Sequence, residues 1–282
     1  MKLATVAVDG RITWGLIEGE SFLDVGVTLK PRYADLKAAL GAALAGIADT
    51  KVSASAIPLS EVVWLPVIPN PDKILCVGLN YETHRKETGR TEVEHPTIFS
   101  RYANSQTGHM QPIVRPRVST DLDFEGELAV IVGKPGRYIS RADAMSHIAG
   151  YSCYNDGSVR DFQRHTHQFT PGKNFPDTGA FGPWMMTPDE LGELGELKLQ
   201  TRLNGQVVQE AQIKQMIFDI PRQIEYCSTF TRLEPGDVIV SGTPGGVGAR
   251  RTPPLWMKPG DVVEVEVERL GVLRNPVADE AR

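Results

Sequence analysis

Two glutamates separated by one glycine stand directly before an apolar run. Glu125 and Glu127 flank Gly126, and residues 128–132 read Leu-Ala-Val-Ile-Val. If this run is a strand, both carboxylates point to the same face, because side chains alternate across a strand. Two ionised carboxylates on one buried face need a cation, a shared proton or solvent to offset their repulsion. A divalent metal is the simplest of these, although the solvated face of an edge strand shows the same spacing.

A third carboxylate, Asp156, follows within a polar, turn-forming segment at residues 154–158. Carboxylate oxygens without nearby cysteine or obligatory histidine favour a hard metal ion. The sequence therefore favours Mg²⁺, with Mn²⁺ or Ca²⁺ as alternatives, and disfavours zinc.

A histidine and a carboxylate lie three residues apart in the segment after residues 73–78, a candidate strand. Asn80 can cap a short helix that places His84 and Glu87 on one face. Such a carboxylate holds the imidazole in one tautomer and leaves its other nitrogen to take a proton from water. The alternative is an ordinary solvated helix surface.

Lys173 lies in a second polar segment, residues 171–175, downstream of another at residues 160–163. Both segments carry too many hydrogen-bonding groups to be core. Lys173 is a candidate to stabilise a developing oxyanion or enolate, with an ordinary surface lysine as the alternative. His165 and His167 read as mobile loop residues.

Residues 241–248 form a glycine-rich loop at the end of an apolar strand. Glycines there let backbone amides approach a ligand closely. The loop lacks the lysine of a phosphate-binding P-loop and departs from the GxGxxG spacing, so we expect no nucleotide site.

Two parts of the chain must position these residues. The first, residues 1–65, alternates short strands at 3–8 and 11–17 with an Ala-rich helix at 33–48, which predicts a small α+β domain. Three prolines within residues 66–71 form a stiff connector, so we place the domain boundary there. Residues 71–282 form the second domain.

The second domain reads as mainly β, with no regular alternation of strands and helices. A turn signal at residues 204–205 predicts a hairpin. The expected helices are residues 141–148, capped by Ser140, and residues 213–229. The expected strands are residues 73–78, 97–100, 127–133, 198–203, 237–241 and 262–269.

Composition excludes several classes of protein. The chain has 282 residues, is 41% hydrophobic and carries a formal net charge of −5, with its basic residues scattered. Nucleic acid is therefore not expected as a partner, and no apolar stretch approaches the ~20 residues of a membrane span. The amino terminus lacks a signal-peptide pattern, which predicts a cytoplasmic protein. Three widely spaced cysteines, Cys76, Cys153 and Cys227, read as buried thiols.

These motifs, taken together, resemble the fumarylacetoacetate hydrolase family over residues 71–279. Several separated motifs in the same order make this resemblance more specific than any one of them. They are residues 78–81 with His84 and Glu87, residues 123–128, residues 155–163, Gly172 with Lys173, residues 241–244 and residues 258–261.

The resemblance implies a fold that is α+β but mainly β, a mixed β-sandwich roll with a small amino-terminal domain. It implies a homodimer and a Mg²⁺ or Mn²⁺ ion held by Glu125, Glu127 and Asp156. It further implies that His84 and Glu87 are a water-activating dyad, on a segment that often becomes ordered only when ligand binds.

The resemblance also suggests substrate contacts. Gln163, Lys173 and Thr243 match positions that contact the substrate or its leaving oxygens. Arg101 stands where the family often has a lysine, and we expect it to meet a substrate carboxylate, because guanidinium binds carboxylates bidentately. Gly157 stands where the family more often has a larger residue, and we expect it to loosen the loop without removing the metal.

The leading hypothesis is a metal-dependent hydrolase that cleaves a carbon–carbon bond in an acylpyruvate or a related 1,3-diketo acid such as fumarylpyruvate, in the breakdown of aromatic compounds. His84, oriented by Glu87, would activate water, while the metal and Lys173 stabilise the departing enolate. The same chemistry serves an isomerase of hydroxymuconate-type dienes or an oxaloacetate decarboxylase. A non-catalytic binding protein is the remote alternative. The expected partner is a small oxo acid.

Overall fold

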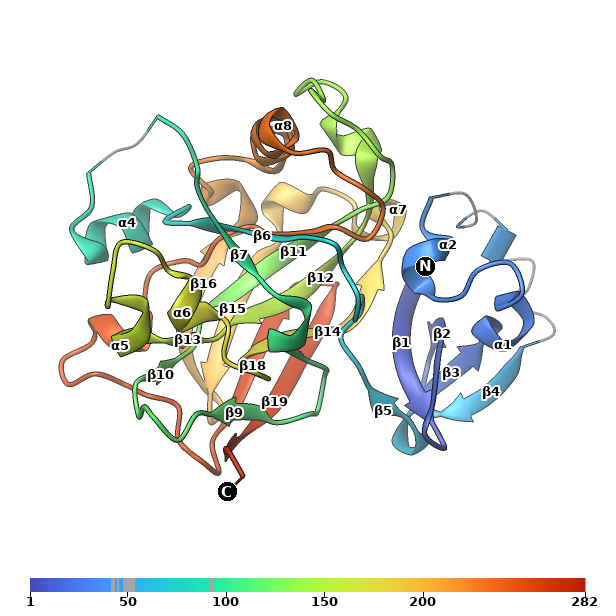
Figure 1. Ribbon diagram of the computed structural model, residues 1–282, viewed down its shortest axis with the longest axis horizontal. Helices are drawn as coiled ribbons and strands as arrows, with labels where there is room; N and C mark the ends of the chain where they lie inside the picture. The colour runs from blue at the N-terminus through green and yellow to red at the C-terminus, as the bar shows by residue number, and fades with distance from the viewer. Residues whose placement is uncertain (42–43, 45, 48–53, 92–93, 282) are drawn as a thin grey trace.

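Short strands separated by Gly, Pro and Asn make up most of the fold, as the sequence predicts. The computed structural model describes residues 1–41, 44, 46–47, 54–91 and 94–281. The amino-terminal strands lie at one end of the molecule, and the strands and loops of the larger part fill the rest (Figure 1). The mainly β class is therefore confirmed.

A mixed sheet of 12 strands runs through the molecule in the order β4-β3-β2-β1-β14-β12-β11-β17-β6-β7, with β5 on β1 and β8 on β14. Neighbours are antiparallel except for the parallel pairs β17–β6 and β14–β8. The strands are β1 (Lys2–Val8), β2 (Arg11–Glu18), β3 (Ser21–Asp24), β4 (Ser55–Pro58), β5 (Val63–Trp64), β6 (Ile74–Gly78), β7 (Thr97–Arg101), β8 (Gln106–Thr107), β11 (Gly126–Val132), β12 (Ile148–Asp156), β14 (Gly179–Met186) and β17 (Val238–Val240).

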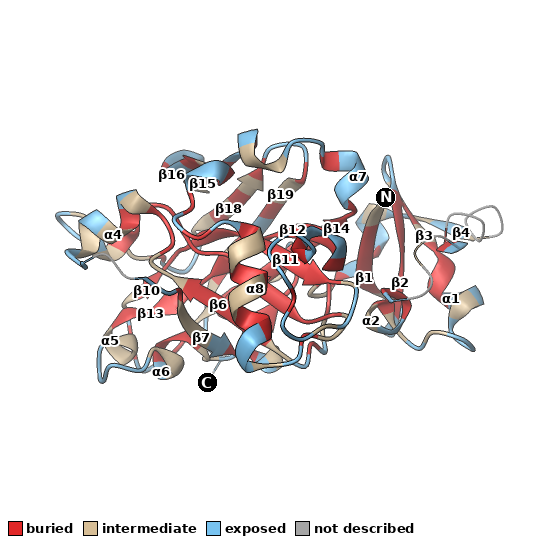
Figure 2. Ribbon diagram, turned by 90° about the horizontal axis from the view of Figure 1, so that it is seen from above, coloured by how far each residue is buried: buried red, intermediate tan, exposed pale blue. Residues whose placement is uncertain are grey.

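A second sheet of five strands packs on one face of β11, β12 and β14 (Figure 2). The predicted hairpin joins β15 to β16 through Asn204 and Gly205, which adopt φ values of 51° and 78°. The strands, in sheet order, are β16 (Gln206–Gln212), β15 (Lys198–Leu203), β18 (Val262–Val267), β19 (Gly271–Asp279) and β9 (Ile113–Arg115), and a separate pair is formed by β10 (Leu122–Asp123) and β13 (Ser158–Val159).

Period-two alternation in β11 supplies two cores. One face packs against the five-stranded sheet and the helix α8 (Ile220–Phe230), and the opposite face packs with residues of the amino-terminal strands. The first face carries Leu128, Val130 and Val132, and the second carries Ala129 and Ile131. Glu127 continues the second face. Its carboxylate therefore points away from the five-stranded sheet.

Helices are few and short. The α-helices are α1 (Val25–Leu29), α2 (Leu36–Ala39), α4 (Glu82–Thr88), α5 (Arg160–Gln163), α6 (Thr170–Lys173), α7 (Pro188–Leu191) and α8 (Ile220–Phe230). The 3₁₀ turns are η2 (Leu59–Glu61), η3 (Ala103–Ser105), η4 (Ala144–His147), η5 (Leu194–Glu196), η6 (Ile213–Gln215) and η7 (Gly248–Arg250).

The helix predicted at residues 213–229 is shorter than expected. The chain forms the turn η6, becomes extended at Met216, and begins α8 only at Ile220. Asp219 caps α8 by accepting a hydrogen bond from the Arg222 amide at 2.9 Å. Pro221 lies in the first turn, where its missing N–H costs nothing. The cap and the proline therefore set the start, which apolar spacing alone did not reveal.

The α-helix predicted at residues 141–148 is wrong, since these residues, all of them described, form turns, then η4 and, at Ile148, the start of β12. Ser140 and Asp143 bond to each other locally. The hydroxyl donates to Asp143 Oδ2 at 2.7 Å and accepts from the Asp143 amide at 3.2 Å. Such local bonds compete with a helical backbone.

The amino-terminal part contains the predicted strands. Within the helix predicted at residues 33–48, α2 and residues 44, 46 and 47 are helical. Residues 42, 43, 45 and 48 lie outside the described residues. Asp35 caps α2 through a 2.8 Å bond from the Ala38 amide. β1 pairs with β14, so this part extends the large sheet. The domain boundary at residues 66–71 stays a prediction.

The close approach of the two sheets depends on Gly126. A Cβ at this position would lie 1.9 Å from Thr201 Oγ1, and Thr201 is fully buried in β15. We expect Gly126→Ala to lower the free energy of unfolding by about 1–3 kcal/mol, measured by urea denaturation with a chelator present. Gly195→Ala is the control, because the nearest atom to its Cβ would be Lys214 Cβ at 3.5 Å. Equal stability of the two variants would contradict this packing argument.

Candidate active site

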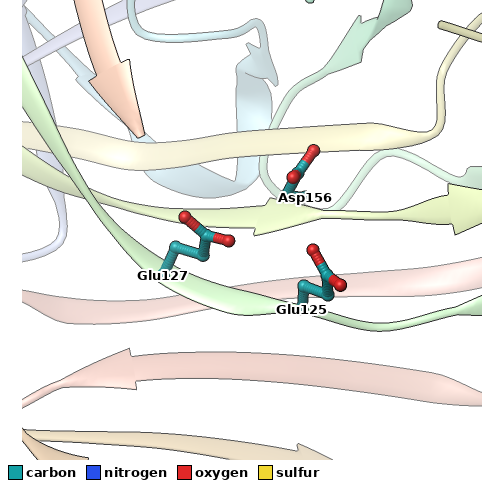
Figure 3. Close-up of side chains that lie close together, drawn as sticks. All are labelled: Glu125, Glu127 and Asp156. Atoms are coloured by element: carbon teal, nitrogen blue, oxygen red, sulfur yellow. The ribbon is translucent and has the colours of Figure 1, made fainter. Parts of the chain in front are cut away.

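Paired strands bring the three predicted metal ligands together. Glu125 and Glu127 flank the start of β11, and Asp156 ends β12, where the Asp156 amide donates to the Glu125 carbonyl at 2.8 Å. Carboxylate oxygens of the three residues lie within 4.8 Å of one another, and all three side chains are buried. The three carboxylates gather in one small region at the edge of the strands (Figure 3). We call Glu125, Glu127 and Asp156 the carboxylate trio.

Lys173 and Arg160 neutralise part of the trio. Lys173 Nζ lies 2.6 Å from Glu125 Oε2 and 2.6 Å from Asp156 Oδ2. Arg160 Nη2 lies 2.6 Å from Glu125 Oε1. Burial raises the pKa of Glu125, but Arg160 and Lys173 outweigh this effect and hold that pKa well below its ordinary range. Glu125 is therefore ionised.

Arg101 takes a different place from the predicted one. Its Nη1 donates to Asp156 Oδ1 at 2.7 Å and to the Gly157 carbonyl at 2.9 Å, and its Nη2 donates to Thr178 Oγ1 at 2.8 Å. The side chain is completely buried and is not part of the cavity wall. The expected contact with a substrate carboxylate is corrected: the carboxylate that Arg101 binds is Asp156.

Gly157 does not loosen the loop after Asp156. A Cβ at Gly157 would lie 2.1 Å from the Thr178 carbonyl oxygen. Thr178 and Asp156 are also both bound by Arg101. The glycine therefore permits close backbone contact, which corrects the expectation drawn from its small size.

Glu127 differs from the rest of the trio because no cation neutralises it. Within the described part of the chain, no Lys or Arg forms an ion pair with its carboxylate, which accepts a bond from the Gly242 amide at 2.5 Å. Burial, followed by the charges of Asp156 and Glu125, raises the pKa of Glu127 well above its ordinary range.

The charge balance fits a divalent cation. The trio and the neighbouring Asp123 supply four carboxylates, whereas Arg101, Arg160 and Lys173 supply three cations. One carboxylate is therefore left without a cation in a buried site, where it must hold a proton or bind a metal ion. Oxygen donors of this kind are the ligands that Mg²⁺ and Mn²⁺ prefer.

The His84–Glu87 dyad forms as predicted. His84 Nδ1 lies 2.7 Å from Glu87 Oε1 on α4, and Glu87 Oε2 accepts a bond from the Gly246 amide at 2.9 Å. Thr83 accepts a second bond from this loop, from the Gly245 amide at 3.0 Å. The glycine-rich loop thus orients the carboxylate that orients His84.

Asn80 does not cap α4. Tyr81 occupies the cap position, without a side-chain hydrogen bond to the helix. The Asn80 amide group instead donates to the Phe218 and Ser241 carbonyls and accepts from the Phe218 amide. Asn80 is fully buried, so its bonds join three separate segments next to the dyad.

A cavity of about 410 Å³ brings the dyad and the trio together. Of the predicted residues, Asp156, Glu87 and Arg101 lie behind its wall. Those in the wall are His84, Glu125, Glu127, Gln163, Lys173 and Thr243. One cavity therefore gives access to a base, two carboxylates of the trio and an ammonium group.

Gln163 and Thr243 have side-chain bonds that fix them in the wall. Gln163 Oε1 accepts from Arg160 Nη1 at 2.9 Å. Thr243 Oγ1 donates to the Gly126 carbonyl at 3.0 Å and accepts from Gln209 Nε2 at 2.8 Å. Their contact with substrate stays a prediction.

The sequence reasoning gave no role to several residues of the site. Asp123 is fully buried and pairs with Arg160, and Arg164 and Arg250 lie in the cavity wall. His165 and His167, interpreted as loop residues without a site, also lie in this wall. The local pattern nearest to these residues is the spacing of Arg160 and Gln163, which lie three residues apart on α5 and therefore on one face of it.

The cysteines are buried thiols, as predicted, and all three are free. Burial raises the pKa of Cys153 and that of Cys227 to about 12. Neither thiol is therefore a thiolate nucleophile at neutral pH.

On this double-sheet fold, a buried carboxylate trio that could bind a metal ion lies next to the same cavity as a histidine–glutamate dyad. The family described as "Fumarylacetoacetate (FAA) hydrolase C-terminal" matches residues 73–278. The chain belongs to this family.

Similar proteins carry more than one activity. The mitochondrial oxaloacetate tautomerase FAHD2A of Homo sapiens is 43% identical over 223 residues, which cover 78% of this chain and 71% of that protein. The structure of 2-hydroxyhepta-2,4-diene-1,7-dioate isomerase from Mycobacterium marinum is 29% identical with a TM-score of 0.78, and 100% of each chain is covered. Maleylpyruvate hydrolase from Sphingobium sp. SYK-6, in complex with manganese(II) and pyruvate, is 25% identical with a TM-score of 0.83, again covering 100% of both chains.

None of the helices in the described residues is long and apolar enough to span a membrane. The cytoplasmic location, the homodimer and the absence of a nucleic-acid partner stay predictions.

Replacing Glu127 with Gln should change how the protein responds to metal. Without metal, we expect E127Q to match the original protein in stability to within about 1 kcal/mol, because the raised pKa of Glu127 favours its neutral form and the glutamine amide is also neutral and of similar shape. With millimolar Mg²⁺ or Mn²⁺, the original protein should gain stability, since the metal binds the folded state, and the variant should gain little. Calorimetric melting with and without a chelator measures both effects. Glu82→Gln, on the exposed surface of α4, should alter neither, and an original protein whose melting ignores both metals would contradict the metal site.

Proposed function

We propose that the protein is a divalent-metal-dependent enzyme that interconverts the keto and enol forms of a 2-oxo acid, with oxaloacetate as the first candidate. The observation that carries this proposal is the cavity shared by His84, Lys173 and two carboxylates of the trio, Glu125 and Glu127. The similarity to oxaloacetate tautomerases over most of the chain supports the choice of reaction.

Keto–enol exchange needs a base for the carbon next to the oxo group and positive charge near the oxygen. His84 supplies the base. A carboxylate oxygen of Glu87 faces His84 Nδ1 and accepts the Nδ1–H, which leaves Nε2 as the proton acceptor on the cavity side. His84 takes the proton from the carbon and delivers it to the oxygen, so atoms and charge balance.

Positive charge for the oxygen comes from groups at the trio. Lys173 Nζ is held at the cavity wall by Glu125 and Asp156. A divalent cation bound by the trio would supply Lewis-acid stabilisation of the negative charge on the oxo oxygen. The buried position of Lys173 strengthens its effect, because water does not screen the charge there.

Hydrolysis of an acylpyruvate, the reaction expected from the sequence, is the second candidate. The same dyad can take a proton from water, and the water then attacks the distal carbonyl. The likeness to maleylpyruvate hydrolase supports this reading. Isomerisation of hydroxymuconate-type dienes uses the same base and the same positive site. Decarboxylation of oxaloacetate uses the positive site, which stabilises the enolate that forms as carbon dioxide leaves.

Product analysis separates these reactions. Purified protein with Mg²⁺ or Mn²⁺ is given oxaloacetate, a hydroxymuconate and two acylpyruvates in heavy-oxygen water. A tautomerase speeds the loss of enol absorbance without new products, whereas a hydrolase places solvent oxygen in a new carboxylate and a decarboxylase releases carbon dioxide. If none of the substrates reacts with either metal, the proposed function is wrong.

The dyad should act as a unit. We expect His84→Asn and Glu87→Gln each to lower kcat by about 10²–10⁴-fold, because general base catalysis is lost or misdirected. The double variant should be little worse than either single variant. Steady-state kinetics on the active substrate, with metal binding measured in parallel, tests this.

Glu82→Gln is the matched control, since Glu82 lies on the same helix and pairs with Arg85 on the surface. This control should keep its rate. A His84→Asn protein that binds metal and retains more than a third of the original kcat would remove His84 from the mechanism.

A further inference from the structure

The cavity wall contains three arginines that the proton transfer does not use, Arg90, Arg164 and Arg250, and the last two lie close enough to act on each other electrostatically. Arg164 follows α5, and Arg250 ends η7. Neither guanidinium forms an ion pair or hydrogen bond with any other residue in the described ranges, whereas Arg101 and Arg160 are both paired with carboxylates. Both arginines are therefore available to a ligand.

A single buried carboxylate holds the two arginine-bearing segments side by side. Asp123 accepts bonds from the amides of Gly248 and Ala249 at 2.8 and 2.9 Å. The same carboxylate accepts from Arg160 Nε at 2.8 Å. Arg250 follows directly on the first pair, and Arg164 lies one helical turn after Arg160. The position of both arginines is therefore built into the fold.

Gly248 makes this arrangement sterically feasible. A Cβ there would lie 1.9 Å from the Leu255 carbonyl oxygen and 2.6 Å from Asp123 Oδ1. The glycine therefore lets the loop lie directly on Asp123, and this contact fixes the path of the chain into Arg250.

The charges around Arg164 and Arg250 favour the binding of an anion. Partial burial lowers the pKa of Arg164, and the charges of Arg160 and Arg250 lower it further. Asp121 and Asp123 act in the opposite direction but do not cancel these effects. Two like-charged guanidinium groups held near each other at a cavity wall attract a carboxylate, which each can bind bidentately.

We infer that Arg164 and Arg250 bind the second carboxylate of a 2-oxo dicarboxylic acid, at the end of the cavity away from its oxo group. This inference rests on the proposed function, because it takes the 2-oxo end of the substrate to lie at the trio and His84. The substrate class becomes a dicarboxylate, and the two arginines become its specificity residues.

Unreactive ligands test the subsite without turnover. Malate and 2-hydroxybutanoate differ in that a methyl group replaces the second carboxylate. Titration calorimetry with Mn²⁺ present gives both dissociation constants for the original protein and for Arg164→Gln, Arg250→Gln, the double variant and Arg164→Lys. Arg137→Gln is the control, because Arg137 lies on the surface outside the cavity wall.

The original protein should bind malate at least tenfold more tightly than 2-hydroxybutanoate. Each Gln variant should weaken malate about tenfold and leave 2-hydroxybutanoate within twofold, since one charge-assisted contact is lost. Arg164→Lys should lose less than Arg164→Gln, and the control should change neither constant. The kcat/KM values for oxaloacetate and 2-oxobutanoate should follow the same pattern.

The results separate the two proposals. Equal weakening of both ligands, or an original protein without a malate preference, overturns the subsite. If the variants turn over oxaloacetate and their dissociation constants for malate are unchanged, the subsite is overturned and the proposed function stands. A third outcome is that the original protein prefers malate and the Gln variants lose this preference, but the original protein turns over no oxo acid. This outcome supports the subsite and overturns the proposed function.

Discussion

An unbalanced group of buried charges is the constraint on which the site depends. The trio and Asp123 bring four carboxylates into a region with three cations, and Glu127 is the group left without one. A buried carboxylate without a cation must hold a proton or bind a metal ion, so the site favours a divalent ion when one is available. Lys173 contacts two members of the trio. A metal ion bound by the trio would therefore share carboxylates with Lys173. Its binding would change the contacts that Lys173 makes with them.

The two sheets hold the carboxylates of the trio close together despite their repulsion. β11 buries apolar side chains on both faces, and the trio lies where the ladder between β11 and β12 ends. Rigid strands on both sides hold like charges at short range, which a loop could not do against their repulsion. Gly126 permits the five-stranded sheet to approach this point closely. The packing that stabilises the fold thus also fixes the distances between the ligands.

The sequence predicted the parts of the site that depend on local spacing and missed those that depend on long-range contacts. Glu125 and Glu127 follow strand periodicity, and His84 with Glu87 follows helix periodicity, so both pairs could be found. Asp156 was a candidate from its own polar segment, and the resemblance to a family joined it to the glutamates as the third ligand and supplied the β-sandwich roll. Arg101 was misplaced because its partner, Asp156, is 55 residues away. The helix expected at residues 141–148 failed for a local reason, since Ser140 and Asp143 bond to each other.

One segment, residues 242–249, connects every part of the site through its backbone. Its amides donate to Glu127 from Gly242, to Thr83 and Glu87 from Gly245 and Gly246, and to Asp123 from Gly248 and Ala249. The loop therefore sets the position of the dyad relative to the trio, and of Arg250 relative to both. Strands fix the trio, whereas this loop fixes the base and Arg250. Because loops change more readily than strands between related proteins, such a division lets relatives keep one metal site while they differ in the reaction and in the far end of the substrate.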